Sequence, residues 1–174
     1  MKLWNTTAAI LIVAFFISCD QKVEEKETTT NNLEETIRET NEIRYQAWNT
    51  GNPDLMEAQL SDDFVRYANG DIEFEGKSGY TNLMNMYLTG FPDLHFEYEL
   101  VAVKNNKSFT KWTATGTNAG MFNGAPATGN QIMVHGFSVI TYNDEGKIIK
   151  EEAYMDNLKA YTSIGYSLAP PNVD

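Results

Sequence analysis

The residues around Asp156 are the first in the chain whose types and spacing could do chemistry. Glu152, Tyr154 and Asp156 alternate along a predicted strand, so a regular strand would place all three on one face. A carboxyl group among apolar walls has a raised pKa and can serve as both acid and base. Two plainer interpretations stay open. Asp156 directly precedes a predicted helix, where Asp is a common N-cap. Glu151 and Glu152 also suit solvated sheet surface, and a bulge would reverse the facing.

His135 lies in the middle of another predicted strand, on the same face as Phe137 and Val139. A histidine there could donate a hydrogen bond to a developing oxyanion or relay a proton. A half-buried strand histidine with a satisfied partner is the more common use. The other histidine, His95, lies forty residues away without carboxylates at ligand spacing, so we expect no metal site.

Aromatic residues could wall a binding pocket. Tyr45 and Trp48 belong to a predicted helix and Trp112 to a predicted strand, and we expect them to line a ligand pocket together with Tyr154 and Glu152. Aromatic residues at such positions are also ordinary core. No phosphate-binding loop, nucleophile elbow or dinucleotide fingerprint occurs.

Cys19 is the only cysteine, which excludes an internal disulfide and a zinc site of several thiolates. It follows Lys2 and ten apolar residues at 8–17, a run too short to span a bilayer but typical of a secretory signal. Phe16-Ile17-Ser18-Cys19 resembles the lipobox of bacterial lipoproteins, which implies a lipid at Cys19 that anchors the protein in the bacterial cell envelope. We therefore predict a lipoprotein signal peptide at 1–18. A plain secretory signal with an incidental cysteine is the alternative.

The composition fits one folded domain behind a polar linker. Residues 20–32 contain a single apolar residue, so we predict a flexible acidic tether at 19–32, then a domain at 33–168 and a tail at 169–174. The chain has 174 residues, 42% of them hydrophobic, which can fill a core. The 24 acidic and 13 basic residues give a formal net charge of −11. That charge argues against nucleic acid as a partner, because phosphate backbones require clustered Lys and Arg.

Hydrophobic periodicity predicts the elements that must position these residues. Helical spacing predicts helices at 33–50, 53–60 and 78–89. Alternation predicts two short strands, 64–67 and 72–74, around the turn Asn69-Gly70-Asp71. It then predicts long strands at 95–104, 108–117, 131–142 and 147–156. A last short helix is expected at 157–164. Helices followed by long antiparallel strands indicate an α+β domain with the helices on one face of the sheet.

Several segments of this pattern resemble a known family. Ala47-Trp48-Asn49-Thr50-Gly51-Asn52 and Leu60-Ser61-Asp62-Asp63-Phe64-Val65 resemble the opening of the nuclear-transport-factor-2-like superfamily. Its SnoaL-like polyketide cyclase (ester cyclase) branch is similar at Phe91-Pro92-Asp93-Leu94, Trp112, Thr115-Gly116-Thr117, the loop at 120–129 and the stretch from Gly146 to Asp156. The resemblance covers about residues 33–165.

The resemblance implies a cone-shaped domain in which a strongly curved antiparallel sheet packs on three helices from the N-terminal half. It implies a homodimer through the sheet and a small hydrophobic ligand or substrate inside the cone. The cyclases of the branch close a ring by an aldol reaction without metal or organic cofactor. Their acid/base group is an Asp near the end of the last long strand, and Asp156 occupies that position.

Two functions stay open, and a purely structural dimer module is a third. One is a cofactor-independent cyclase, isomerase or hydrolase acting on a small apolar carbonyl compound through Asp156, with His135 as a second catalytic candidate. The other is a non-catalytic ligand-binding or accessory lipoprotein domain. The export signal and two departures from the branch favour this second function. The departures are Asn118, where many members have His, and Glu152-Ala153, where many have Glu followed by Trp.

Overall fold

The computed structural model describes the backbone of residues 17–170 and the side chains of residues 32–170. Leu33–Asp174 forms one compact unit, and Met1–Asn32 is a separate one. The fold reported below is that of the larger unit. Residues 1–16 of the predicted signal peptide, the side chain of Cys19 and residues 171–174 of the predicted tail lie outside the described residues.

Three helices precede the long strands, as predicted: α1 (Ile17–Thr50), α2 (Pro53–Glu57) and α3 (Lys77–Gly90). The backbone of α1 is helical from Ile17 rather than from residue 33, so the segment predicted as a tether is part of this helix. Asn52 caps α2, because its side chain accepts hydrogen bonds from the first amides of that helix. Among the described helices, none combines the length and the apolar character that a membrane crossing requires.

A six-stranded sheet forms the second layer, in the order β2-β1-β6-β5-β4-β3. Four of its five strand pairs are antiparallel, as predicted, but β1 and β6 run parallel. Asn69 and Gly70 have φ angles of +52° and +99°, which the tight turn between β1 and β2 requires. The strands are β1 (Leu60–Ala68), β2 (Asp71–Glu75), β3 (His95–Lys104), β4 (Lys107–Thr117), β5 (Gln131–Tyr142) and β6 (Ile148–Met155).

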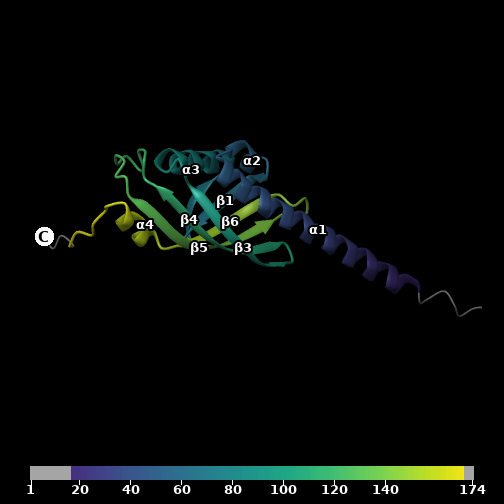
Figure 1. The fold of residues 1–174 in the computed structure, drawn as a ribbon. Helices are drawn as coiled ribbons and strands as arrows, with labels where there is room; N and C mark the ends of the chain where they lie inside the picture. Colours follow the sequence, from purple (N-terminus) through teal and green to yellow (C-terminus); the bar gives the residue numbers. More distant parts are fainter. Residues whose placement is uncertain (1–16, 171–174) are drawn as a thin grey trace, which may run out of the picture. The chain divides into compact units, whose positions relative to one another are not determined.

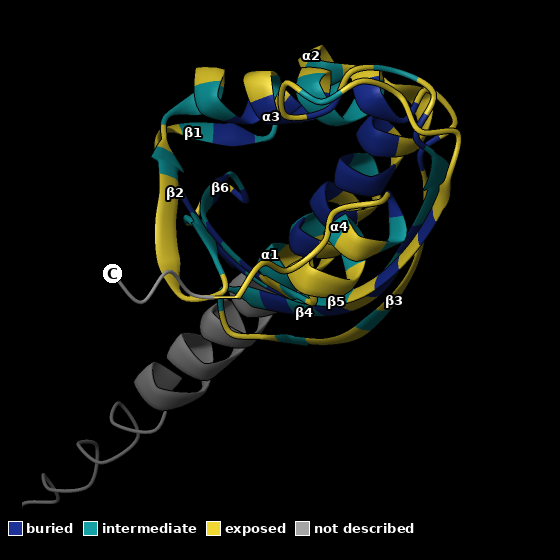
Figure 2. Cartoon of the chain, turned by 90° about the vertical axis from the view of Figure 1, so that its left-hand side faces the viewer, coloured by how far each residue is buried: buried dark blue, intermediate teal, exposed yellow. Residues whose placement is uncertain are grey.

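The sheet lies against the helices (Figure 1) and curves around them, and its two edge strands, β2 and β3, stay unjoined (Figure 2). Buried residues line the inside of this curve, and the outer surface is mostly exposed or intermediate (Figure 2). A last helix, α4 (Asn157–Ser163), follows β6 and packs against β5. This arrangement confirms the α+β fold with a curved sheet wrapped on helices.

One irregularity in β6 decides which of its side chains face the helices. Tyr142 of β5 pairs with Ile148, but the preceding Thr141 pairs with Lys150. Ile149 is therefore an extra residue on β6, which is a β-bulge. Because side chains alternate between faces, one extra residue exchanges the two faces for the rest of the strand.

The bulge reverses the predicted facing at the end of β6. Glu151 and Ala153 are buried, whereas Tyr154 is 44% exposed. Glu152 lies with Tyr154 on the outer face and pairs there with Lys150 at 3.0 Å. The expectation that Glu152 and Tyr154 face a pocket is thus wrong, and so is the interpretation of Glu151 as solvated surface.

Candidate functional site

A pocket lies between the helices and the concave face of the sheet. The empty volume of this pocket, including its opening to solvent, is about 780 Å³. The centre of a water molecule fits in only about 70 Å³ of this volume. The pocket is therefore narrow. Apolar side chains form most of its wall, as in small-molecule sites generally. Eight of the wall residues are aromatic and come from α1, α3, β3, β4, α4 and the segments next to them: Trp48, Tyr80, Tyr87, Phe91, Phe96, Trp112, Phe122 and Tyr161.

The aromatic walls are held in place by ring contacts and hydrogen bonds. The ring centroid of Phe96 lies 5.3 Å from that of Trp48 and 5.6 Å from that of Trp112. Trp112 Nε1 donates a hydrogen bond to Ser138 Oγ at 3.0 Å. Its ring crosses β5 at Gly136, where a Cβ atom would lie only 2.1 Å from the indole. Glycine at position 136 is thus what gives Trp112 its place in the wall.

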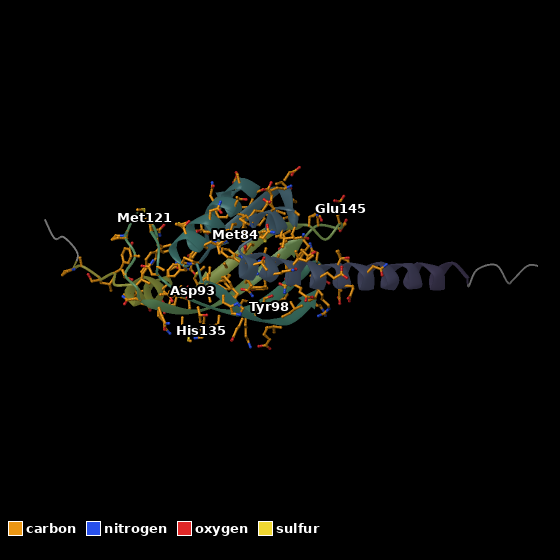
Figure 3. All side chains as sticks on the ribbon, turned by 45° about the horizontal axis from the view of Figure 1, so that its top comes forward. Met84, Asp93, Tyr98, Met121, His135 and Glu145 are labelled. Atoms are coloured by element: carbon orange, nitrogen blue, oxygen red, sulfur yellow. The ribbon has the colours of Figure 1, made fainter. Side chains whose placement is uncertain are left out.

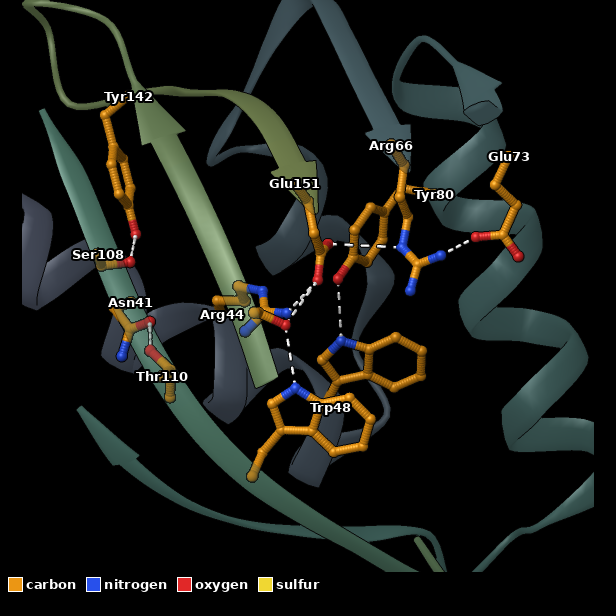
Figure 4. Close-up of polar contacts among 12 residues, drawn as sticks. Asn41, Arg44, Trp48, Arg66, Glu73, Tyr80, Ser108, Thr110, Tyr142 and Glu151 are labelled. Atoms are coloured by element: carbon orange, nitrogen blue, oxygen red, sulfur yellow. Dashed lines mark hydrogen bonds and ion pairs between the residues drawn. The ribbon is translucent and has the colours of Figure 1, made fainter. Parts of the chain in front are cut away.

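Three buried charged residues line the inner end of this apolar pocket. Arg44 comes from α1, Arg66 from β1 and Glu151 from β6, and they are 4%, 6% and 1% exposed. Arg44 Nη2 forms a close ion pair with Glu151 Oε1. Arg66 Nε lies 3.6 Å from Glu151 Oε2 (Figure 4). We call these three residues the charged cluster.

Polar neighbours surround the charged cluster. Glu73 pairs with Arg66 Nη1 from the side of β2. Ser138 Oγ reaches Glu151 Oε1 at 3.5 Å. The Tyr80 hydroxyl lies beside the carboxylate and accepts a hydrogen bond from Trp48 Nε1 at 3.2 Å (Figure 4). The pocket therefore has apolar walls and one polar end.

The cluster keeps its ionised state although it is buried. Burial alone raises the pKa of Glu151, but Arg44 and Arg66, with a smaller contribution from the nearby Tyr80 hydroxyl, outweigh it and bring this pKa below its ordinary value. Burial lowers the pKa of Arg44, but Glu151, Tyr45 and Tyr80 together outweigh it and bring this pKa above its ordinary value. Burial and Glu151 raise the pKa of Tyr80 to about 12. At neutral pH the polar end thus holds two guanidinium ions, a carboxylate and a neutral phenol.

None of the three residues of the charged cluster was among the predicted site residues, although the sequence carried a signal. Arg44 is seven residues after Ile37 and four before Trp48, so it stands on the apolar stripe of α1. Arg66 is two residues after the buried Phe64 and so shares its strand face. A charged residue at a position that the sequence pattern turns toward the core, once in α1 and once in β1, was the signal that could have revealed the cluster.

The structure places Asp156 at the rim of the pocket, not in its wall. Asp156 is exposed and caps α4, where its Oδ1 accepts a hydrogen bond from the Lys159 amide at 2.9 Å. Its two neighbours, Met155 and Asn157, do line the pocket. The contact that Asp156 makes is therefore the one expected of a helix N-cap.

Of the other candidate residues, the structure brings only Trp48 and Trp112 to the pocket. Tyr45 is buried and stacks on Tyr98, with ring centroids 4.0 Å apart, outside the pocket wall. His135 is exposed on the outer face of the sheet, where Nδ1 lies 2.9 Å from Thr113 Oγ1 (Figure 3). Across the described part of the chain, no three His, Cys, Asp or Glu side chains are grouped to hold a metal ion.

Comparison with solved structures finds the same fold in proteins with different names. A protein named as a SnoaL-like polyketide cyclase from Jannaschia sp. CCS1 aligns with a TM-score of 0.70 and 23% identity, over 80% of this chain and 96% of its own. AclR from Streptomyces galilaeus, named as a hydroxylase, aligns with a TM-score of 0.67 and 22% identity, over 79% and 89%. A phenazine biosynthesis-related protein from Pseudomonas aeruginosa aligns with a TM-score of 0.64 and 16% identity, over 82% and 94%.

These likenesses establish the fold but not a reaction, because one fold carries different chemistries. Comparison with curated proteins gives no match. The sequence profile of the SnoaL-like polyketide cyclases, in contrast, matches residues 39–164, which include the charged cluster, the aromatic walls and Asp156. The chain belongs to the SnoaL-like polyketide cyclase family.

Proposed function

We propose that this domain binds a small, flat, mainly apolar molecule in the pocket. The observation that carries the proposal is the narrow, aromatic-walled pocket closed at its inner end by the charged cluster. Rings fixed by contacts such as Phe96 with Trp112 favour a planar ligand that can lie against them. A wall that is already formed also lowers the entropy cost of binding.

A pair of variants on β4 tests this function. Ala114 lines the pocket, whereas Thr113 precedes it on the opposite face of the strand. We expect Ala114→Leu to fill the narrow space and weaken binding of 2-methoxynaphthalene at least about tenfold in calorimetric titrations. Thr113→Leu is the matched control and should bind like the unchanged chain. Equal binding by both variants would place the ligand elsewhere.

A second function, cofactor-independent acid/base catalysis such as aldol cyclisation, isomerisation or hydrolysis, has one observation in its favour. Asp156 lies between two residues of the pocket wall, at the position that the family resemblance gives to the acid/base group. Glu151 is a poor alternative base, because two guanidinium groups hold its pKa low.

Asp156→Asn separates catalysis from capping, since Asn caps helices about as well as Asp. A substrate is first identified by mass spectrometry of any ligand that co-purifies with the protein. If Asp156 is the acid/base group, the variant loses turnover of this substrate while the midpoint of its thermal unfolding is unchanged. Turnover that survives in Asp156→Asn would remove the catalytic role and leave ligand binding.

We also propose that the domain is exported and held in the bacterial cell envelope by a lipid on Cys19. The sequence supports this, because the apolar run at 8–17 ends at the lipobox-like residues and a polar segment follows them. A lipid would supply a membrane attachment that an acidic chain lacks by itself.

We further propose a homodimer through the outer face of the sheet. Apolar residues gather there without cover from the helices. Phe109, Phe137 and Val139 are half-buried, and Met133 and Tyr154 are 54% and 44% exposed. A second copy of the same face would remove this apolar surface from water.

A further inference from the structure

The polar end of the pocket contains an acceptor and a donor that do not satisfy each other. Glu151 Oε2 and Arg66 Nε are both buried, and neither has a hydrogen bond of normal geometry with the described residues. They lie 3.6 Å apart, which is beyond the range of a hydrogen bond. Buried polar atoms in folded proteins nearly always have a partner. The gap between these two atoms is thus a place for one more polar atom.

A hydroxyl oxygen fits this place better than a charged group. At about 2.8 Å from both atoms it would donate its proton to Glu151 Oε2 and accept one from Arg66 Nε. A ligand carboxylate can only accept, and it would lie against the ionised Glu151. The surrounding charges also need no anion, because Arg44 and Arg66 are matched by Glu151 and by Glu73.

The walls next to this place fix the shape of the rest of the molecule. The charged cluster and the aromatic residues Trp48, Phe96 and Trp112 line the same narrow pocket. A ring system that carries the hydroxyl can therefore lie between these aromatic side chains.

We infer that the pocket selects a flat, neutral molecule with a hydroxyl group, such as a phenol, whose oxygen bridges Glu151 Oε2 and Arg66 Nε. This inference rests on the proposed function, binding of a flat apolar ligand in the same pocket. It adds the polar group that the ligand must carry and the two residues that recognise it.

Calorimetric titration of the full chain with 2-naphthol, 2-methoxynaphthalene and 2-naphthoate tests the inference. The three probes share one ring system and differ in the oxygen group. We expect 2-naphthol to bind at least about tenfold tighter than the methyl ether, which cannot donate to Glu151 Oε2. We expect 2-naphthoate to bind more weakly than 2-naphthol.

The variant Glu151→Gln identifies the acceptor. Arg44 and Ser138 contact Oε1, so the amide oxygen should stay there and an NH₂ group should replace Oε2. The preference for 2-naphthol over its methyl ether should then fall to about onefold. Glu152→Gln, one residue along on the outer face, is the matched control and should keep the preference.

Each other outcome has a clear meaning. Equal affinity of the unchanged chain for 2-naphthol and its methyl ether overturns the hydroxyl site but leaves pocket binding intact. Tightest binding of 2-naphthoate overturns it in favour of an anion site. Binding of none of the probes, or binding that Ala114→Leu does not alter, removes the proposed function itself. If Glu151→Gln does not fold, the three titrations of the unchanged chain still decide.

Discussion

Glu151 connects three elements through one carboxylate. It meets Arg44 of α1 and Arg66 of β1 from its own strand, β6, and all three residues are buried. Transfer of such charges out of water is costly, so the pair energies do not simply add to stability. Removal of one partner is different, because the remaining charges stay buried without compensation.

Glu151→Gln should therefore destabilise the domain strongly. The neutral amide leaves the buried Arg44 guanidinium without its counter-charge and Arg66 with Glu73 alone, and we expect a loss of about 3–5 kcal/mol in the free energy of unfolding. Urea unfolding at pH 7 measures this. Glu152→Gln breaks only the partly exposed pair with Lys150 and should cost about 1 kcal/mol or less. Similar losses in the two variants would show that the cluster holds little of the fold together.

The acid side of the stability profile gives a second prediction. The folded state lowers the pKa of Glu151 below its ordinary value of 4.5. Its contribution is therefore fully present above that value and is lost as the pH falls through the lowered folded pKa. We expect the difference in unfolding free energy between the unchanged chain and Glu151→Gln to be largest at pH 7 and to shrink below pH 4.5. A difference that stays constant down to pH 2 would contradict this assignment.

At the scale of elements, hydrophobic period and turn residues were enough to predict the helices and strands after residue 33. Asn69-Gly70 and Gly51 gave clear boundaries because their positive φ angles suit few other residues. The parallel pairing of β1 with β6 left no local sign, since it joins residues about ninety positions apart, such as Leu60 and Ile148.

The facing of β6 is where sequence reasoning failed for the site. Ile148 and Ile149 are both apolar, so hydrophobicity does not reveal which of them is the extra residue. The pairing with β5 decides it and brings Glu151, not Glu152, inside. The extra residue Ile149 thus places the predicted pocket residues Glu152 and Tyr154 on the outer surface. The predictions for Trp48 and Trp112 were unaffected, because these residues lie on other elements.

The contact between β4 and β5 gives a prediction at this scale. Gly136→Ala should push the Trp112 indole away from β5 and cost about 1–3 kcal/mol, because a Cβ would overlap the ring. In a Trp112→Leu background the same change should cost clearly less. Denaturant unfolding of the four proteins in this cycle measures the coupling. Additive losses would mean that the ring does not need the space above Gly136.

At the scale of the whole molecule, the outer sheet face leads to a test of assembly. We expect light scattering after size exclusion to give twice the chain mass. Tyr154→Lys places a charge on the apolar outer face and should produce a monomer with little change in the stability of each chain. Ile72→Lys is the control, because Ile72 lies on edge strand β2 and is already 58% exposed. This variant should remain dimeric. A monomeric unchanged chain would rule out the dimer.

Attachment to the envelope is tested at Cys19. We expect Cys19→Ala expressed in a bacterial host to leave the membrane fraction, because the lipid acceptor is gone. Ser18→Ala keeps a small residue before the cysteine and should fractionate with membranes like the unchanged chain. Membrane fractionation of Cys19→Ala equal to that of the unchanged chain would exclude the lipid anchor.

The parallel pairing of β1 and β6 also sets the order in which the domain can be completed. A ribosome makes the β1–β2 hairpin early, but the neighbour that joins it to the rest of the sheet is the last strand synthesised. Glu151, with which Arg66 also pairs, is synthesised about eighty-five residues after it. Until β6 emerges, Arg44 lacks the carboxylate with which it pairs and the nascent chain cannot close its core. We therefore expect the chain to stay without a closed core through most of its own synthesis, which suits the export proposed above, because general secretion carries unfolded proteins across a membrane.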